Sequence, residues 1–188
     1  MKFIVGKPPN INFNPQNEGW KSEKESGLIK LQILVIPIAL VLALIIDSIY
    51  YILNINIFDS YVSIIYIALI IIPLHELSHA LLFPKGIFSE DVLFGFYPKA
   101  LIFYAHYEGE IKRKRFLLVL LAPFIIISIL PLIYIIVSGS KNVFLAEVIF
   151  INAMASSIDL LTITQTMKKI PKNALIRYKG FKSFWKEF

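Results

Sequence analysis

The sequence contains no cysteine. Without thiols the chain forms no disulfide and offers no thiolate to a metal, so a bound metal must be held by His, Asp or Glu side chains. Histidine is scarce as well, with three residues among 188. These absences confine any metal site to a few positions in the chain.

Charged residues are also few, and they are unevenly distributed. Asp, Glu, Lys and Arg make up 17% of the chain, and 19 basic residues against 13 acidic ones give a formal net charge of +6. A basic chain can bind nucleic acid, but here the basic residues adjoin long apolar runs, where membrane orientation and anionic lipid explain them more simply. We therefore predict no nucleic-acid partner.

Apolar residues, in contrast, are abundant and make up 57% of the sequence. Crossing the hydrocarbon layer of a membrane takes about 20 apolar residues in helical form. Four stretches satisfy this length, and they lie at about 32–53, 61–83, 116–137 and 143–166. The polar remainder is too short to cover such a core in a soluble protein. We therefore predict an all-α membrane protein, a bundle of four transmembrane helices.

The basic residues predict how these helices are oriented. All of the 19 Lys and Arg residues except Lys141 lie before the first apolar run, between the second and third, or after the fourth. Because Lys and Arg are enriched in cytoplasmic loops, both termini are predicted to face the cytoplasm of a multi-pass cell-membrane protein. No small-residue cleavage site follows the first run, so we expect it to remain as an anchor and not to be removed as a secretory signal.

The chain shows no internal repeat and is predicted to form one membrane domain with two polar ends. The expected parts are a cytoplasmic arm at 1–31, a four-helix transmembrane domain at 32–166 and a basic cytoplasmic tail at 167–188. Between the second and third helices, two apolar and aromatic stretches at about 92–105 flank a Tyr97-Pro98-Lys99 turn and predict a small cytoplasmic β-hairpin. The tail mixes basic and aromatic residues, which suits either a membrane face or a solvated tail.

A metal-binding motif lies in the second apolar run, at His75-Glu76-Leu77-Ser78-His79. Two histidines four residues apart project from one face of a helix and can bind one metal ion together. Glu76 is predicted to take a proton from a water whose pKa zinc lowers to about 7. A hydrogen-bonded cluster between helices is the alternative, but the cost of burying three polar side chains in a span favours function.

A catalytic zinc has three protein ligands and one open position, so one further ligand is needed. Counting about 1.5 Å of rise per residue from the outer helix ends, His75 lies about 21 Å deep, His79 about 27 Å, and Asp159 in the fourth run about 24 Å. Glu147 and Asp47 lie nearer the outer ends of their runs. Asp159 is therefore the predicted third ligand.

Two further polar residues share a helical face with Asp159. Asn152 and Ser156 precede it by seven and three residues, and they can orient the ligand or a substrate carbonyl. A role as polar contacts between helices is equally consistent with their position. His106 follows the predicted hairpin without ligand spacing to another residue, so it is left out of the site.

The motif residues resemble a known family. His75-Glu76-Leu77-Ser78-His79-Ala80 in the second run and the segment Asn152–Asp159 in the fourth are similar to the membrane-embedded zincin peptidases of bacteria and archaea, which are related to the site-2 intramembrane metalloproteases. The likeness extends from Gly19-Trp20-Lys21 to Lys169-Ile170-Pro171. It implies that the two histidines and Asp159 hold zinc and that Glu76 activates water. The chain departs from the site-2 proteases at Leu160, where those enzymes usually have glycine.

These observations predict an intramembrane zinc metalloendopeptidase with one zinc ion per chain. Its partners are predicted to be the lipid bilayer and a membrane-anchored protein, which it hydrolyses through a zinc-activated water with Glu76 as the general base. The hairpin at 92–105 offers a strand edge on which an unwound substrate can pair. Two alternatives are a non-catalytic membrane adaptor and a zinc-dependent hydrolase of a non-peptide substrate. Glu76 argues against the adaptor, because metal binding alone does not require it.

Overall fold

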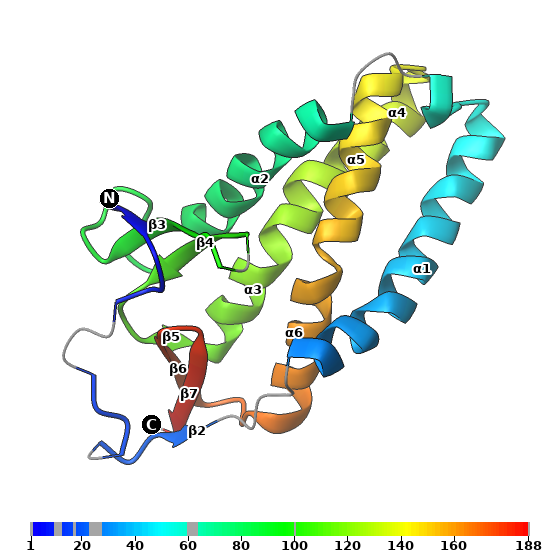
Figure 1. Ribbon diagram of the computed structural model, residues 1–188. Helices are drawn as coiled ribbons and strands as arrows, with labels where there is room; N and C mark the ends of the chain where they lie inside the picture. The colour runs from blue at the N-terminus through cyan, green and yellow to red at the C-terminus, as the bar shows by residue number, and fades with distance from the viewer. Residues whose placement is uncertain are drawn as a thin grey trace. The chain divides into compact units, whose positions relative to one another are not determined.

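The chain forms two compact units in the computed structural model. Figure 1 shows its helices and strands. The structure describes residues 2–9, 13–16, 18–22, 28–59, 64–99 and 101–187. Unit 1 comprises Met1–Ser26, Glu76–Leu120 and Ile163–Phe188, and unit 2 comprises Gly27–His75 and Leu121–Thr162. Each unit therefore collects segments that are far apart in the sequence.

Unit 2 is helical throughout its described residues. It contains α1 (Leu28–Leu53), the short η1 (Ile57–Asp59), the π-helix η2 (Phe124–Ile129), α4 (Leu130–Ser138) and α5 (Val143–Ala155). Its core is made of apolar side chains, which are Ile46, Tyr50, Ile55, Leu132, Ile135, Ala146, Ile149 and Ala153. The Tyr50 hydroxyl donates a 2.8 Å hydrogen bond to the Ala146 carbonyl, so the one polar atom that this ring buries is satisfied.

Three further helices begin in one unit and end in the other. They are α2 (Ile64–Leu81), α3 (Arg113–Pro123) and α6 (Ser157–Lys169). α3 continues directly through η2 into α4, whereas α5 and α6 are separated at Ser156, whose ψ of −7° departs from helical geometry. The irregular turns at η2 and Ser156 interrupt otherwise apolar helices.

Three helical segments are long and apolar enough to cross a membrane, namely Lys30–Leu53, Arg113–Ser138 and Val143–Lys169. By length and composition they indicate a membrane protein. The second predicted span has a shorter counterpart among the described residues, an apolar helix at Ile65–Leu81. Residues 61–63, which the sequence assigns to that span, lie outside the described residues.

All described strands lie in unit 1, where they form two sheets. In sheet A, β3 (Val92–Tyr97) pairs with β4 (Ile102–Tyr107) in an antiparallel hairpin. This is the hairpin that the sequence predicts at about 92–105. Ala100, at the tip of that hairpin, lies outside the described residues. The amino-terminal strand β1 (Lys2–Val5) pairs in parallel with β3. β4 is therefore an edge strand of the described sheet.

Sheet B has the strand order β2-β7-β6-β5. Its main part is a hairpin of β6 (Ala174–Lys179) and β7 (Lys182–Glu187), joined by a two-residue turn in which Gly180 adopts a φ of +62°. Tight hairpin turns require positive φ, which glycine adopts without steric cost. The two-residue strands β2 (Lys21–Ser22) and β5 (Ile111–Lys112) flank this hairpin.

The predicted all-α four-helix bundle is wrong. The described part of the chain contains seven strands in two sheets, so the protein mixes helices with β-structure. The error arises at the chain ends, where the arm contributes β1 and β2 and the basic tail contributes β6 and β7. Composition made both ends look like polar extensions, but β1 and β2 pair with strands distant in the sequence. β6 and β7 pair with each other, and β5 and β2 complete their sheet.

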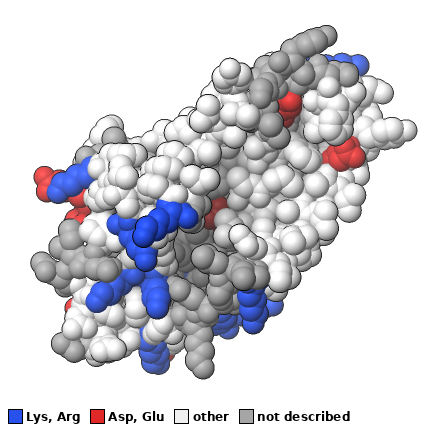
Figure 2. Space-filling view, in the orientation of Figure 1, with Lys and Arg blue, Asp and Glu red and all other residues white. Residues whose placement is uncertain are grey.

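Unit 1 also holds most of the positive charge. All Lys and Arg residues except Lys30 and Lys141 fall within its segments, and Figure 2 shows blue side chains gathered over the strands of this unit. Its apolar core packs the ends of helices against the sheets and consists of Ala80, Phe83, Val92, Tyr107, Ile111, Phe116, Val119, Leu120, Ile170, Ala174 and Ile176. The core of unit 1 thus holds the carboxyl end of α2, where the metal-binding motif lies, against β-structure.

Replacement of Gly95 by alanine should destabilise unit 1. A Cβ atom at Gly95 would overlap the Tyr104 ring, which lies across the neighbouring strand and donates a 2.9 Å hydrogen bond to the Gly6 carbonyl. We expect a loss of about 1–3 kcal/mol, measured as a lower unfolding temperature of the detergent-solubilised protein. Combining Gly95→Ala with Tyr104→Ala should be no worse than Tyr104→Ala alone. Unchanged stability of the single Gly95→Ala variant would contradict this packing.

Candidate metal centre

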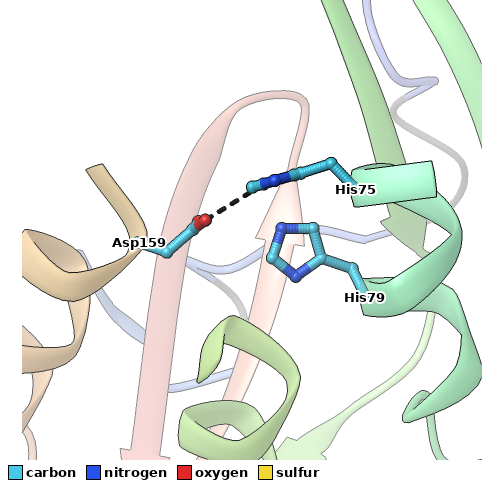
Figure 3. A group of neighbouring side chains, drawn as sticks. All are labelled: His75, His79 and Asp159. Atoms are coloured by element: carbon cyan, nitrogen blue, oxygen red, sulfur yellow. Dashed lines mark hydrogen bonds and ion pairs between the residues drawn. The ribbon is translucent and has the colours of Figure 1, made fainter. Parts of the chain in front are cut away.

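The motif histidines lie on α2, one helical turn apart. α2 is continuous from Ile64 to Leu81, so the spacing between His75 and His79 is set by the helix itself and both rings project from one face. Both are buried, with 8% and 9% of their surface exposed. Figure 3 shows the two rings together with Asp159 of α6.

His75 is oriented by Asn152 of α5, which is fully buried. The His75 Nδ1 lies 3.0 Å from the Asn152 Oδ1. The Asn152 Nδ2 donates to the Pro123 carbonyl at 3.0 Å and to the Ser128 hydroxyl at 2.9 Å, which fixes the orientation of the amide. Oδ1 must then be the acceptor, so the Nδ1 of His75 carries the proton and donates it to Asn152.

The other ring nitrogen of His75 faces Asp159. His75 Nε2 and Asp159 Oδ2 are 3.2 Å apart, and only 9% of the surface of Asp159 is exposed. Because Nδ1 already carries a proton, the neutral ring turns the Nε2 lone pair toward a carboxylate oxygen, which is repulsive. A positive charge must lie at this point, either a second proton on the ring or a bound cation.

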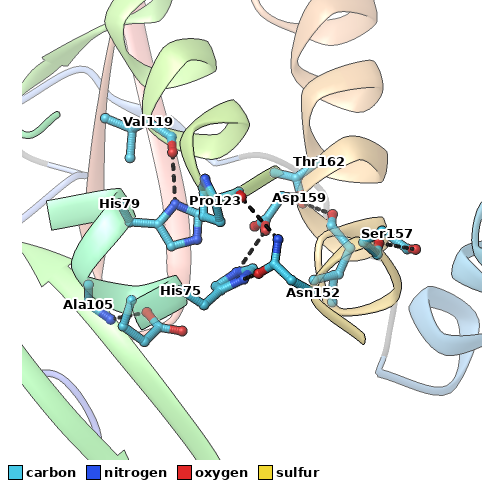
Figure 4. A network of polar contacts seen from close by, with 12 residues as sticks. His75, His79, Ala105, Val119, Pro123, Asn152, Ser157, Asp159 and Thr162 are labelled. Atoms are coloured by element: carbon cyan, nitrogen blue, oxygen red, sulfur yellow. Dashed lines mark hydrogen bonds and ion pairs between the residues drawn. The ribbon is translucent and has the colours of Figure 1, made fainter. Parts of the chain in front are cut away.

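His79 is oriented by the backbone of α3. Its Nδ1 lies 2.8 Å from the Val119 carbonyl oxygen, which can only accept, so Nδ1 donates and the lone pair of the neutral ring is on Nε2. Figure 4 shows this contact beside the His75 network. The two histidines are thus held in the same tautomer, with Nε2 as the atom able to bind a metal, by hydrogen bonds of the kind that accompany metal-ligating histidines.

The donor set fits zinc. One ligand atom from each of His75, His79 and Asp159 lies within 4.8 Å of the others. Tetrahedral zinc with bonds of about 2.0–2.2 Å places neighbouring donor atoms roughly 3.3 Å apart, close to the 3.2 Å between His75 and Asp159. Closing the three donors on one ion requires adjustments on the order of 1–2 Å. Two imidazoles and a carboxylate leave the fourth position open, as a catalytic zinc requires.

Glu76 is held by the edge of sheet A. Its Oε2 accepts a 2.5 Å hydrogen bond from the Ala105 backbone N–H of β4. Helical geometry places Glu76 beside His75, and the bond to Ala105 fixes one carboxylate oxygen. A carboxylate held next to a three-ligand zinc site is suited to proton transfer with a water molecule.

Among the described residues, the other polar candidates are not part of the group that could hold a metal ion. Ser156 is fully buried at the end of α5, and its hydroxyl makes no hydrogen bond within the part of the chain that the structure describes. His106 lies in β4 near the Tyr178 ring, where burial lowers the pKa of its imidazole to about 4. Asp47 and Glu147 line an apolar pocket beside α1 and α5. The metal-binding role of Asp159, in contrast, is consistent with its contact to His75.

Comparison with known families agrees with this geometry. A sequence model of the family "Putative zincin peptidase" matches residues 68–175, more than half of the chain, and the match includes the motif and Asp159. The chain belongs to this family. No curated protein and no solved structure matches it.

Membership in the zincin peptidase family indicates a metallopeptidase and implies zinc as its metal. The cluster of His75, His79 and Asp159 is a separate observation, which comes from geometry and not from the family match. The family implies zinc, and the cluster consists of side chains that could hold a metal ion. The relation to the site-2 proteases stays a prediction.

Several groups that shape the site have no signal in the sequence. Two of these groups are backbone carbonyls, those of Val119 and Pro123, and a third is the Ala105 amide. Every residue carries such groups, so no side-chain pattern identifies the ones that a fold will use. Ser128 was the one detectable clue, because a buried serine in an apolar run needs a partner.

Replacement of Asn152 by leucine should weaken metal binding. The substitution keeps a similar volume but removes the acceptor for the His75 Nδ1–H, and loss of such a partner lowers metal affinity by about 10–100-fold. Zinc affinity is measured by chelator competition on the detergent-solubilised protein.

Asn142→Ala is the matched control, because Asn142 Oδ1 accepts from the Leu145 N–H at the start of α5. Loss of this cap costs about 1 kcal/mol of stability and should leave zinc affinity unchanged. Equal affinities for the wild type and a folded Asn152→Leu variant would refute the positioning role of Asn152.

Proposed function

We propose that the protein is a membrane-embedded zinc metalloendopeptidase that hydrolyses a peptide bond of a membrane-anchored protein. One observation carries the proposal. His75, His79 and Asp159 converge with both histidines in the metal-binding tautomer, and Glu76 is fixed beside them. Metal storage or a purely structural role requires the three ligands but gives no reason for Glu76.

Each residue has a distinct role in this reaction. The two imidazoles and the Asp159 carboxylate would hold the ion, which as a three-ligand site would accept water or the substrate carbonyl as well. Zinc bound there supplies a Lewis acid that lowers the pKa of water to about 7 and polarises the carbonyl under attack. Asn152 keeps His75 in position through its Nδ1–H.

Glu76 moves the proton. It accepts a proton from the attacking water as the water oxygen bonds to the carbonyl carbon, and it returns that proton to the amide nitrogen as the C–N bond breaks. One water molecule is consumed, and the products are a carboxylic acid and an amine, which at neutral pH become a carboxylate and an ammonium by transfer of the remaining proton. The Ala105 N–H engages one oxygen of Glu76, and the second oxygen is assigned to proton transfer.

The apolar helices support a membrane setting for this chemistry. Three segments have the length and composition of membrane spans, and Asp159 lies within the third of them. The two histidines lie on α2, a shorter apolar helix. We propose that both termini face the cytoplasm, as the distribution of Lys and Arg predicts. A helical substrate must unwind before cleavage, because its peptide bonds are otherwise shielded, and its exposed backbone groups then need new partners.

β4 is suited to supply those partners. The Ala105 N–H bonds Glu76, so it points away from β3. In an antiparallel pair, residues two apart direct their backbone groups to the same side, which turns the N–H and carbonyl of Phe103 outward as well. An extended substrate pairing with this edge would lie beside Glu76.

Metal analysis tests the ligand assignment. Purified wild-type protein should contain about one zinc per chain, as a single three-ligand site predicts. His75→Ala and Asp159→Ala should lose it, whereas Glu76→Gln should retain it, because Glu76 is not a ligand. Elemental mass spectrometry measures the content, and circular dichroism confirms that each variant is folded. A folded wild type that remains zinc-free after reconstitution would remove the basis of the proposal.

Glu76→Gln also tests catalysis. Loss of the general base should slow cleavage by about 10²–10⁴-fold. Sequencing of new peptide termini in membranes that contain the wild type or the Glu76→Gln variant identifies the cleaved proteins. If the zinc-loaded wild type generates no termini beyond those of the variant, hydrolysis of a non-peptide substrate or an adaptor role becomes the better explanation.

Phe103→Pro tests the strand edge. Proline removes the outward N–H of Phe103, and an edge position tolerates it because that N–H faces away from the neighbouring strand. Loss of one substrate hydrogen bond should reduce cleavage roughly 10-fold or more and leave zinc content unchanged. Phe103→Ala is the control, because it removes the ring contact with Phe96 but keeps the N–H. Equal cleavage by both variants would exclude main-chain pairing at this residue.

A further inference from the structure

The helical segment beside the histidines contains a proline where the site needs a free carbonyl. Pro123 is the last residue of α3, and Val119 precedes it by four residues. In an α-helix the N–H of one residue donates to the carbonyl four residues earlier. Proline has no N–H, so the donor that would normally occupy the Val119 carbonyl is missing.

That carbonyl is the one that His79 contacts. The His79 Nδ1 donates to the Val119 oxygen at 2.8 Å, and Val119 is 4% exposed. A buried carbonyl that has lost its helical donor needs another one. The imidazole supplies it, and in doing so His79 is fixed in the tautomer that presents Nε2.

We propose that Pro123 is a positioning residue for the metal site, because it leaves the Val119 carbonyl open and so sets the tautomer and orientation of His79. This inference rests on the metal site described above, but it concerns a residue outside the predicted motif. Pro123 acts through the absence of a hydrogen-bond donor and touches neither the metal nor the substrate.

The carbonyl of Pro123 allows the proposed role to be distinguished from a general role in packing. Its carbonyl accepts from the Asn152 Nδ2 at 3.0 Å, and Asn152 orients His75. Pro123→Ala keeps this carbonyl and adds only an N–H. The variant should therefore disturb His79 and leave His75 as it is, whereas general disruption of the helix would disturb both rings.

The test uses histidine-selective ¹⁵N labelling of the full-length protein in detergent without zinc. The chain has three histidines, so His→Gln variants assign the ring signals. In the wild type both His75 and His79 should carry a proton on Nδ1, and without zinc His75 should carry a second proton on Nε2, which faces the Asp159 carboxylate. Pro123→Ala should shift His79 toward the Nε2-protonated form and leave His75 unchanged.

Zinc affinity provides a second readout. The new N–H competes with His79 for the Val119 carbonyl, so affinity should fall about 10-fold, at the lower end of the effects seen for such partners. Pro131→Ala is the matched control, because Pro131 lies eight residues further along the same helical segment, in α4, and its N–H would face the Ile127 carbonyl. The control should match the wild type in tautomer and affinity.

Three results would overturn the proposal. One is a folded Pro123→Ala variant with wild-type His79 tautomer and affinity, and another is an equal change in the Pro131→Ala control. The third is a zinc-free wild type in which a neutral His79 carries its proton on Nε2. This measurement does not depend on whether Pro123→Ala folds. The tautomer is read without zinc or substrate, so it is independent of whether the protein cleaves peptides.

Discussion

The site depends on one constraint, which is that each buried imidazole must donate its Nδ1–H to a fixed acceptor. His75 donates to Asn152 and His79 to the Val119 carbonyl, at 3.0 and 2.8 Å. In an apolar surrounding an unpaired N–H costs about 1–3 kcal/mol, so these two bonds determine the tautomer of each ring. With Nδ1 protonated, the lone pair of each neutral ring lies on its Nε2. Because the Nε2 of His75 faces the Asp159 carboxylate, a positive charge is needed between them.

Irregular backbone supplies the acceptors that regular helices lack. A continuous helix uses nearly all of its own N–H and carbonyl groups, which leaves none for side chains. Pro123 and the π-helix η2 that follows it break this pattern beside the histidines. Such breaks are tolerated at membrane depth when other groups satisfy the backbone. For Glu76 the irregular helices are not involved. The edge strand β4 of sheet A supplies a hydrogen-bond donor, the outward N–H of Ala105.

The helices were predictable from composition, but the β-structure was predictable only in part. The hairpin of β3 and β4 had local signals, because two aromatic stretches flank a turn. The β6–β7 hairpin had a signal that its basic composition obscured, since Gly180 separates two stretches that each contain apolar or aromatic residues. β1 had none that could identify its partner, because β3 lies about ninety residues away in the chain.

By itself the sequence determined the motif on α2 and the apolar helices, and through helix depth it predicted Asp159 as the third ligand. These follow from spacing and hydrophobicity, which local sequence encodes directly. Only the tertiary structure decided which groups orient the histidines and Glu76, because Val119 and Ala105 act through backbone atoms that every residue has. These contacts form only when segments from different parts of the chain pack together. The spacing of residues within one segment does not reveal which distant segment it will contact.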